Sequence, residues 1–258
     1  MEQEHQALAE SFGELVASLE AQEVSWQAGI TTMDMTSTEA GWLVGSPYVI
    51  TNANADQFTT LLELGTEGTG PEAGFASAQL ALELAVSGPN IGFRRDDAAL
   101  HVIFVSDTDD QSEKWLGDDP SGVFLNVLAS HSMGGKPYAN TSAIAGDVPG
   151  GCASVDGTAT AGTQYDGVVR ETSGLMLSIC SDDFEDLLGA IAAASLVYER
   201  SFELSRVPSG ETSITVTMDA ERIEEGWMYS ATDNSILFET APVAGATLLV
   251  EYLVLVTE

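Results

Sequence analysis

The sequence predicts an α/β protein: a doubly wound, mostly parallel sheet followed by a small all-β module. Up to residue 199, segments with helical spacing alternate with short β-rich runs, which is typical of a parallel sheet covered by helices on both faces. The run Leu100–Val105 is mostly apolar, as expected of a central strand. After Arg200, apolar residues recur at every second position instead. We therefore expect two domains, residues 1–199 and 200–258.

The individual elements follow from apolar spacing and from helix-end signals. The Pro71–Glu72 pair predicts a helix start, because proline suits the first turn and an acid suits the positive end of the dipole. We expect that helix to end before Gly88, and Ser181 or Asp182 to cap the last helix. The other predicted helices are Leu8–Leu19, Asp56–Leu64, Val123–Leu128, Thr163–Glu171 and Phe184–Ala194, and the predicted strands before the β module are Val24–Thr32, Gly41–Val44, Leu100–Val105, Thr141–Ala145 and Leu175–Ile179.

The charge balance limits the classes of molecule that are expected to bind this chain. The chain has 40 acidic and eight basic side chains, for a net charge of −32. We expect no nucleic-acid partner and no membrane insertion, and anionic membranes are poor partners, because phosphate binding rests on Lys and Arg. The scattered acids fit a hydrated surface suited to salty water, and they make divalent cations natural small ligands. No apolar run approaches the roughly 20 residues that span a bilayer, and the opening MEQEHQALAE does not have the layout of a secretory signal.

The two cysteines are Cys152 and Cys180. Two thiols cannot form a four-cysteine metal site. Both lie at predicted loop or strand-end positions, so a single disulfide is one interpretation, and two unrelated buried thiols are the other.

Asp107 ends the most buried predicted strand, where open parallel sheets bind their ligands. Its role is open between a metal ligand, a catalytic nucleophile and a solvated turn. Asp107-Thr108-Asp109 begins like the D-x-D-x-T/V motif of haloacid dehalogenase-type phosphatases, but Gln111 breaks that motif. Ser112 stands where a calcium-binding EF-hand loop needs glycine. The chain lacks the G-x-S-x-G motif typical of serine hydrolases, and its three histidines, His5, His101 and His131, are scattered along the sequence.

The order of several motifs resembles the von Willebrand factor type A (VWA) family, and most closely its secreted bacterial branch. These motifs are the run Trp26–Asp34, the run Gly65–Gly74, the run Val102–Ser112, and the trailing Gly150–Cys152 and Ser178–Cys180. The resemblance covers nearly the whole chain, including the β module. It implies a VWA/Rossmann-like doubly wound fold, a Cys152–Cys180 disulfide and an extracytoplasmic protein, whether periplasmic, cell-surface or secreted.

The resemblance also implies a metal-ion-dependent adhesion site for Mg²⁺ or Ca²⁺. Thr69 and Asp107 match two of the three parts of that site, and hydroxyl and carboxylate oxygens suit such hard cations. Asp109 and Asp110 are further candidates that the spacing does not require. In this family the acidic side chain of a protein partner completes the coordination of the cation. The resemblance therefore predicts non-enzymatic, cation-assisted adhesion or protein–protein recognition, and the alternative is a metal-free structural or interaction domain.

One departure from the family pattern is large. The chain has no D-x-S-x-S motif, and Met1 stands where the bacterial branch has the Met that follows it. The first central strand and three metal ligands are thus missing. Either the sequence is truncated, with a signal segment lost as well, or the strand and the metal were lost together. We favour truncation. We expect weak or no cation binding by these residues. We also expect backbone N–H and C=O groups beside Leu100–Val105 to be unpaired.

Overall fold

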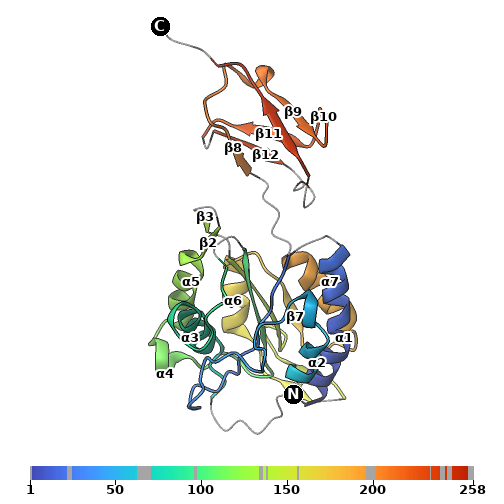
Figure 1. Ribbon diagram of the computed structural model, residues 1–258. Coiled ribbons are helices and arrows are strands. Elements are labelled where there is room, and N and C mark those ends of the chain that lie inside the picture. Colours follow the sequence, from blue (N-terminus) through green and yellow to red (C-terminus); the bar gives the residue numbers. More distant parts are fainter. Residues whose placement is uncertain are drawn as a thin grey trace. The chain divides into compact units, whose positions relative to one another are not determined.

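The computed structural model shows a mixed α/β protein (Figure 1). It describes residues 2–21, 25–62, 71–95, 98–133, 136–137, 139–155, 157–195, 201–232, 234–238, 242 and 246–254. The described residues up to Ser195 form one compact unit, and those from Ser201 onward form a second. The expected boundary after residue 199 falls in the gap between them.

The first unit contains seven α-helices, a 3₁₀ turn and seven strands among its described residues. The helices are α1 (Glu2–Ala21), α2 (Gln57–Leu62), α3 (Gly74–Ser87), α4 (Glu113–Leu116), α5 (Pro120–Ser130), α6 (Thr163–Glu171) and α7 (Phe184–Ser195), and the 3₁₀ turn is η1 (Asn52–Asn54). The strands are β1 (Leu100–Val105), β2 (Ser132–Met133), β3 (Lys136–Pro137), β4 (Ala139–Ala145), β5 (Cys152–Ala153), β6 (Thr158–Ala159) and β7 (Met176–Ser178).

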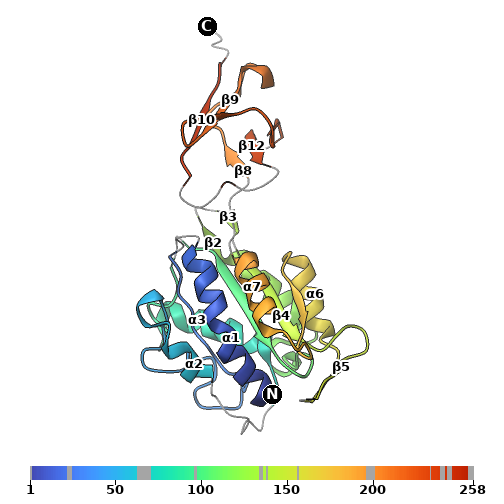
Figure 2. The same ribbon diagram turned by 90° about the vertical axis from the view of Figure 1, so that its right-hand side faces the viewer.

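A three-stranded parallel sheet lies at the centre of this unit, in the order β1-β4-β7. Its two faces are covered by different helices. Phe104, Ala143 and Ala145 point towards α3, α5 and α6, where Phe75, Phe124 and Tyr165 are fully buried. Ile144 points to the opposite side, towards α1 and α7, which lie side by side in Figure 2. The predicted doubly wound arrangement, with helices on both faces of a parallel sheet, is present in this coarse form.

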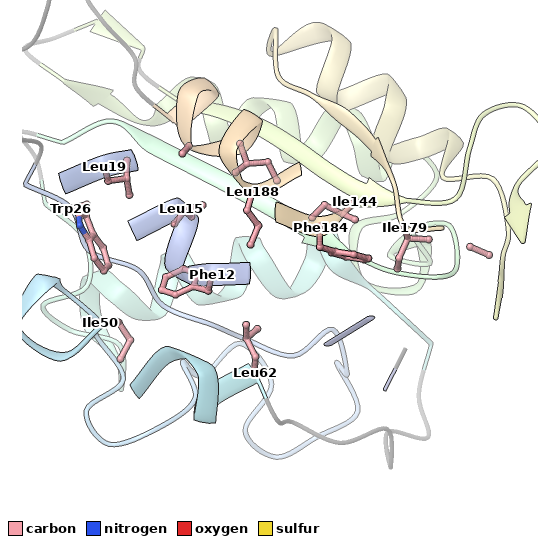
Figure 3. Close-up of a cluster of buried hydrophobic side chains, with 13 residues drawn as sticks. Phe12, Leu15, Leu19, Trp26, Ile50, Leu62, Ile144, Ile179, Phe184 and Leu188 are labelled. Carbon is pink, nitrogen blue, oxygen red and sulfur yellow. The ribbon is translucent and has the colours of Figure 1, made fainter. Parts of the chain in front are cut away.

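The α1 face of the sheet is closed by side chains that are far apart in the sequence. Phe12, Leu15 and Leu19 of α1 meet Leu188 of α7, and Ile144 reaches them from the sheet (Figure 3). The amphipathic spacing predicted helix α1 correctly, and the same spacing determines which side of the helix is buried.

Strand β1 has one strand neighbour among the described residues, β4. The N–H of Ser106 bonds to the carbonyl of Ile144 at 3.1 Å, which places the even-numbered residues of β1 against β4. In a parallel pair successive residues bond to alternate sides. The N–H and C=O of Ile103 therefore point away from β4, and its side chain is 38% exposed. The expectation of a strand covered on both faces is wrong at this position.

The segment preceding α2 differs from the prediction. Residues 25–32 and 41–44 were predicted as strands and form none. Ala28 makes an isolated antiparallel bridge with Ile50, and the N–H of Val44 donates to the carbonyl of Ile30. β-branched composition favours a strand only when a neighbouring strand offers partners. Here the described sheet offers none.

Two helix starts also differ. Helix α3 begins at Gly74, three residues after Pro71, because Glu72 is held in a bridge to Asp34. Helix α7 is capped by Asp183 rather than Ser181 or Asp182, since the Asp183 carboxylate accepts from the N–H of Asp186 at 3.0 Å. The other predicted helices lie where the spacing placed them, and α6 has the predicted bounds.

The second unit is all β, as the alternation predicted. Its strands are β8 (Ser201–Glu203), β9 (Thr215–Met218), β10 (Glu221–Ile223), β11 (Trp227–Ser230), β12 (Ser235–Phe238) and β13 (Leu248–Glu251), with a 3₁₀ turn η2 (Glu211–Ser213). They form two antiparallel sheets, β10-β9-β13 and β11-β12-β8. Val216 and Ile236 are fully buried in the core of the unit.

Candidate functional site at the carboxyl edge of the parallel sheet

The turn after β1 brings polar side chains to the carboxyl edge of the sheet. Asp107 lies directly beyond the strand, partly buried, and its carbonyl accepts from the N–H of Thr160 at 2.9 Å. This bond ties the turn to the segment between β6 and α6. The structure thus places Asp107 where the sequence predicted, at the end of β1.

Glu72 faces the same turn from the segment before α3. Its carboxylate accepts from the hydroxyl of Ser106, and from the hydroxyl of Thr108 at 3.2 Å. Its backbone carbonyl accepts from the N–H of Gln111 at 2.9 Å. Sequence reasoning treated Glu72 as a helix-start acid and missed this role. No local signal links residues 72 and 106, because the contact depends on how the two loops meet.

Asp110 caps helix α3 from another loop. Its carboxylate accepts from the N–H of Phe75 at 3.0 Å, from the N–H of Ser112 at 2.9 Å and from the hydroxyl of Ser112 at 2.9 Å. The Ser112 hydroxyl oxygen in turn accepts from the N–H of Ala76 at 3.0 Å. Two first-turn N–H groups of α3, those of Phe75 and Ala76, are satisfied in this way, although the N-cap residue of the helix, Ala73, makes no side-chain cap bond. Burial raises the pKa of Asp110 above its ordinary value, and the three hydrogen bonds oppose that shift.

Asp109 caps the start of helix α6, as Asp110 caps the start of α3. One oxygen of its carboxylate accepts from the N–H of Gln164, in the first turn of α6, at 2.9 Å, and from the N–H of Asp110 at 3.0 Å. Gln164 also reaches back with its amide to the carbonyl of Asp110 at 3.3 Å. Two neighbouring acids of one turn therefore fix the starts of two helices, and the negative charges lie at the positive ends of the helix dipoles.

Tyr165 lies beneath this turn and is fully buried. Its phenol hydroxyl bonds with the side chain of Ser106 and lies 3.6 Å from the sulfur of Met33. Burial raises the pKa of Tyr165 well above its ordinary value, and the negative charge of Asp110 adds to the shift. The phenol is therefore neutral at physiological pH and acts as a hydrogen-bonding member of the core.

The second predicted metal ligand, Thr69, lies outside the described residues. Among the residues that the structure does describe, no group of three or more His, Cys, Asp and Glu side chains could hold a metal ion. Asp109 and Asp110 were the remaining candidates; both carboxylate oxygens of Asp110 and one carboxylate oxygen of Asp109 accept hydrogen bonds from backbone or hydroxyl donors.

Two of the three histidines, His101 and His131, lie away from this turn. His101, in β1, bonds through Nδ1 to the Ser195 hydroxyl at 2.5 Å and through Nε2 to the Ser142 hydroxyl at 2.9 Å. Ser142 is fully buried. This pair links β1, β4 and α7 inside the fold. His131 follows α5 and bonds to the carbonyl of Val127 at 2.8 Å, and the side chain of His5 lies outside the described residues.

The predicted disulfide is present. Cys152 and Cys180 are joined by an S–S bond of 2.06 Å, with a Cα–Cα distance of 6.1 Å. The bond connects the β5–β6 hairpin to the end of β7, both on the carboxyl side of the sheet. Within the described part of the chain, no helix has the length and apolar character needed to cross a membrane.

Comparisons with protein-family models, with curated proteins and with solved structures found no match to this chain. The resemblance to the VWA family therefore rests on the order of the motifs quoted from the sequence.

Proposed function

We propose that this chain is a non-enzymatic, extracytoplasmic recognition domain of VWA-like fold, which binds a protein partner at the carboxyl edge of its parallel sheet. Three features support the proposal. Helices cover both faces of a parallel sheet. Asp107 lies at the carboxyl end of β1, where open α/β sheets bind ligands. The Cys152–Cys180 disulfide is typical of proteins that work outside the reducing cytoplasm.

The observation that carries the proposal is the double cap made by Asp109 and Asp110. Because these two acids hold the starts of α6 and α3, the turn that begins with Asp107 is fixed to three elements: β1, α3 and α6. A recognition site gains affinity when its groups are held in place before binding. Glu72, bonded to Ser106 and Thr108, adds a second carboxylate to this edge.

A divalent cation is the mode of recognition that the family resemblance implies. Asp107 and Thr69 would hold Mg²⁺ or Ca²⁺, and the bound cation would offer an open coordination position to a partner's carboxylate. Because the described residues form no group of three candidate ligands, we propose weak cation binding by these 258 residues. The alternative is recognition without metal, and the engagement of Asp109 and Asp110 in helix caps favours it for the chain as it stands.

Calorimetric titration with Ca²⁺ and with Mg²⁺ separates the two modes. It should be run on this chain and on a chain extended by the genomic codons upstream of Met1. Cation-assisted recognition predicts binding by the extended chain that is lost in Asp107→Ala and in Thr69→Ala. Glu83→Ala is the matched control, since Glu83 is an exposed acid on α3 more than two turns from its start, and it should leave binding unchanged. No binding by either chain would exclude the cation-assisted mode.

The non-enzymatic part of the proposal has its own test. If Asp107 were a phosphatase nucleophile, the purified chain would hydrolyse p-nitrophenyl phosphate, and Asp107→Asn would abolish turnover. We expect no turnover above the level of a Glu83→Ala control. Turnover that depends on Asp107 would overturn the recognition proposal in favour of an enzyme.

A further inference from the structure

The side chain of His101 connects β1 to β4 and to the end of α7. Its Nδ1 bonds to the Ser195 hydroxyl at 2.5 Å, and its Nε2 bonds to the Ser142 hydroxyl at 2.9 Å. Ser195 is the last residue of α7, and Ser142 lies in β4 and is fully buried. One imidazole ring therefore bridges the sheet and a helix that covers it.

The hydrogen bonds around this ring fit only its neutral form. The Ser195 hydroxyl donates to the carbonyl of Ile191 at 2.8 Å, so its oxygen accepts from Nδ1–H. The Ser142 oxygen accepts from the N–H of Leu175 at 3.0 Å, and its own proton is donated to Nε2. A proton added at Nε2 would point at the proton of that hydroxyl. Imidazolium has two donors and no acceptor, so it cannot keep both bonds as they are.

No described charge compensates a cation at this position. Burial lowers the pKa of His101 to about 4, and it is the one cause of that shift among the described residues. The acids of α7 are in its first turn, more than two turns from Ser195. The negative end of the α7 dipole favours a cation, but the loss of water outweighs it. The nearby charged residues of other segments are Glu20 of α1, which is exposed and bonds to Asn52, and Asp96, Asp97, Glu199 and Arg200, which lie outside the described residues.

The last turn of α7 is held less firmly than the rest of the helix. Ile191 is fully buried in the cluster shared with α1, whereas Ala193 is exposed and Ser195 is only partly buried. Two side-chain bonds tie this turn to the sheet: the bond from His101 to Ser195, and the bond from the Asn140 amide to the carbonyl of Ala194 at 2.9 Å. Strands β1 and β4, in contrast, are paired over six residues. The end of the helix is therefore the part that can move away from the ring.

We propose that the bond between His101 and Ser195 is a latch that releases the last turn of α7 in mild acid. The docked turn requires a neutral ring, whereas release lets water reach the ring and stabilise imidazolium. The released form therefore gains population as the pH falls below about 6.5, where a solvated histidine becomes protonated. Because the chain continues from Ser195 to β8, release lengthens the covalent connection between the two units.

Native-state hydrogen exchange of the whole chain, followed by NMR, tests the latch. The opening equilibrium should be about twenty-fold larger at pH 5 than at pH 7, so the protection of the Ala194 and Ser195 amides should fall by that factor after correction for intrinsic rates. Low concentrations of urea should leave this exchange unchanged, because local release exposes little surface. His101→Gln keeps a neutral hydrogen-bonding side chain, and its protection should differ less than about two-fold between the two pH values.

His131→Gln is the matched control. His131 is also buried, but it bonds to the carbonyl of Val127 in the adjoining helix α5, so this variant should keep the change of about twenty-fold. Equal protection of the parent chain at the two pH values overturns the proposal, and so does the full change in a folded His101→Gln chain. The parent chain alone also decides: if Ala194 and Ser195 exchange with the same protection and urea dependence as the buried Ala143 amide of β4, α7 opens only when the whole unit unfolds.

Discussion

The carboxylate of Asp110 accepts a hydrogen bond from the backbone N–H of Phe75, 35 residues earlier in the chain, at a distance of 3.0 Å. This bond joins the turn after β1 to the start of α3, a helix whose own N-cap residue is an alanine. The acids that follow the apolar strand thus have a structural role beside the proposed recognition role of Asp107: two of them begin helices that cover one face of the sheet.

Replacing Asp110 by alanine should destabilise the first unit. The substitution leaves the N–H groups of Phe75 and Ser112 without their acceptor in a buried site, and we expect a loss of about 1–3 kcal/mol in the free energy of unfolding. Urea denaturation followed by circular dichroism measures it. Asp118→Ala, at an exposed acid in the turn after α4, is the control and should change stability by less than about 0.5 kcal/mol. A loss no larger than that of the control would show that the Asp110 bond does not stabilise α3.

The helix-capping roles of Asp110 and Asp109 could not be predicted from the sequence. The N–H groups that donate to their carboxylates belong to residues 35 and 55 positions away in the chain. Helix α6 was predicted with its observed bounds because its amphipathic spacing and Gly174 are local signals. Residues 25–32, the described part of the predicted strand Val24–Thr32, form no strand, because a strand needs a partner that composition does not reveal. The same limit applies to the site: Asp107 could be placed at the end of β1 from local pattern, whereas the contact of Glu72 with Ser106 depends on the tertiary fold.

Protonation of His101 should weaken the fold in mild acid. Burial lowers the pKa of His101 to about 4, from about 6.5 in the unfolded chain. At pH values between about 4 and 6.5, His101 is protonated in the unfolded chain and neutral in the folded chain. The free energy of unfolding therefore falls as the pH decreases through this range. Below about pH 4 the contribution of His101 no longer changes. The full decrease in the free energy of unfolding is about 3 kcal/mol, because one pKa unit corresponds to about 1.4 kcal/mol. The Ser195 hydroxyl donates to the carbonyl of Ile191, which assigns the neutral-ring proton to Nδ1 and leaves Nε2 to accept from Ser142.

Urea unfolding at a series of pH values, on the parent chain and on His101→Gln, measures this contribution. The difference in unfolding free energy between the two chains should change by about 3 kcal/mol between pH 7 and pH 4. A His101 ring that titrates near pH 6.5 in an NMR experiment on the folded chain would contradict the prediction.

Loss of the Cys152–Cys180 bond should destabilise the first unit without changing its fold. The two cysteines are 28 residues apart, and in the chain-entropy account a loop of that size is worth about 3–4 kcal/mol. The double variant Cys152→Ser, Cys180→Ser should show this loss in chemical denaturation, and added reductant should reproduce it in the parent chain. Because the double variant has no thiols, reductant should leave its stability unchanged. A reductant effect of equal size in that variant would mean that the effect on the parent is not due to the disulfide.

Two glycine substitutions in helices should have opposite effects. A Cβ at Gly74, the first residue of α3, would lie 2.8 Å from the hydroxyl of Tyr165 and 3.1 Å from the ring of Phe104, both in the packed core. Gly74→Ala should therefore cost about 1–3 kcal/mol through overpacking. A Cβ at Gly167, exposed on α6, meets nothing within 4 Å, so Gly167→Ala should stabilise by up to about 1 kcal/mol through helix propensity. Thermal unfolding of the two variants should shift in opposite directions. If Gly74→Ala is neutral, the start of α3 is not packed tightly against Tyr165 and Phe104, and the overpacking prediction is wrong.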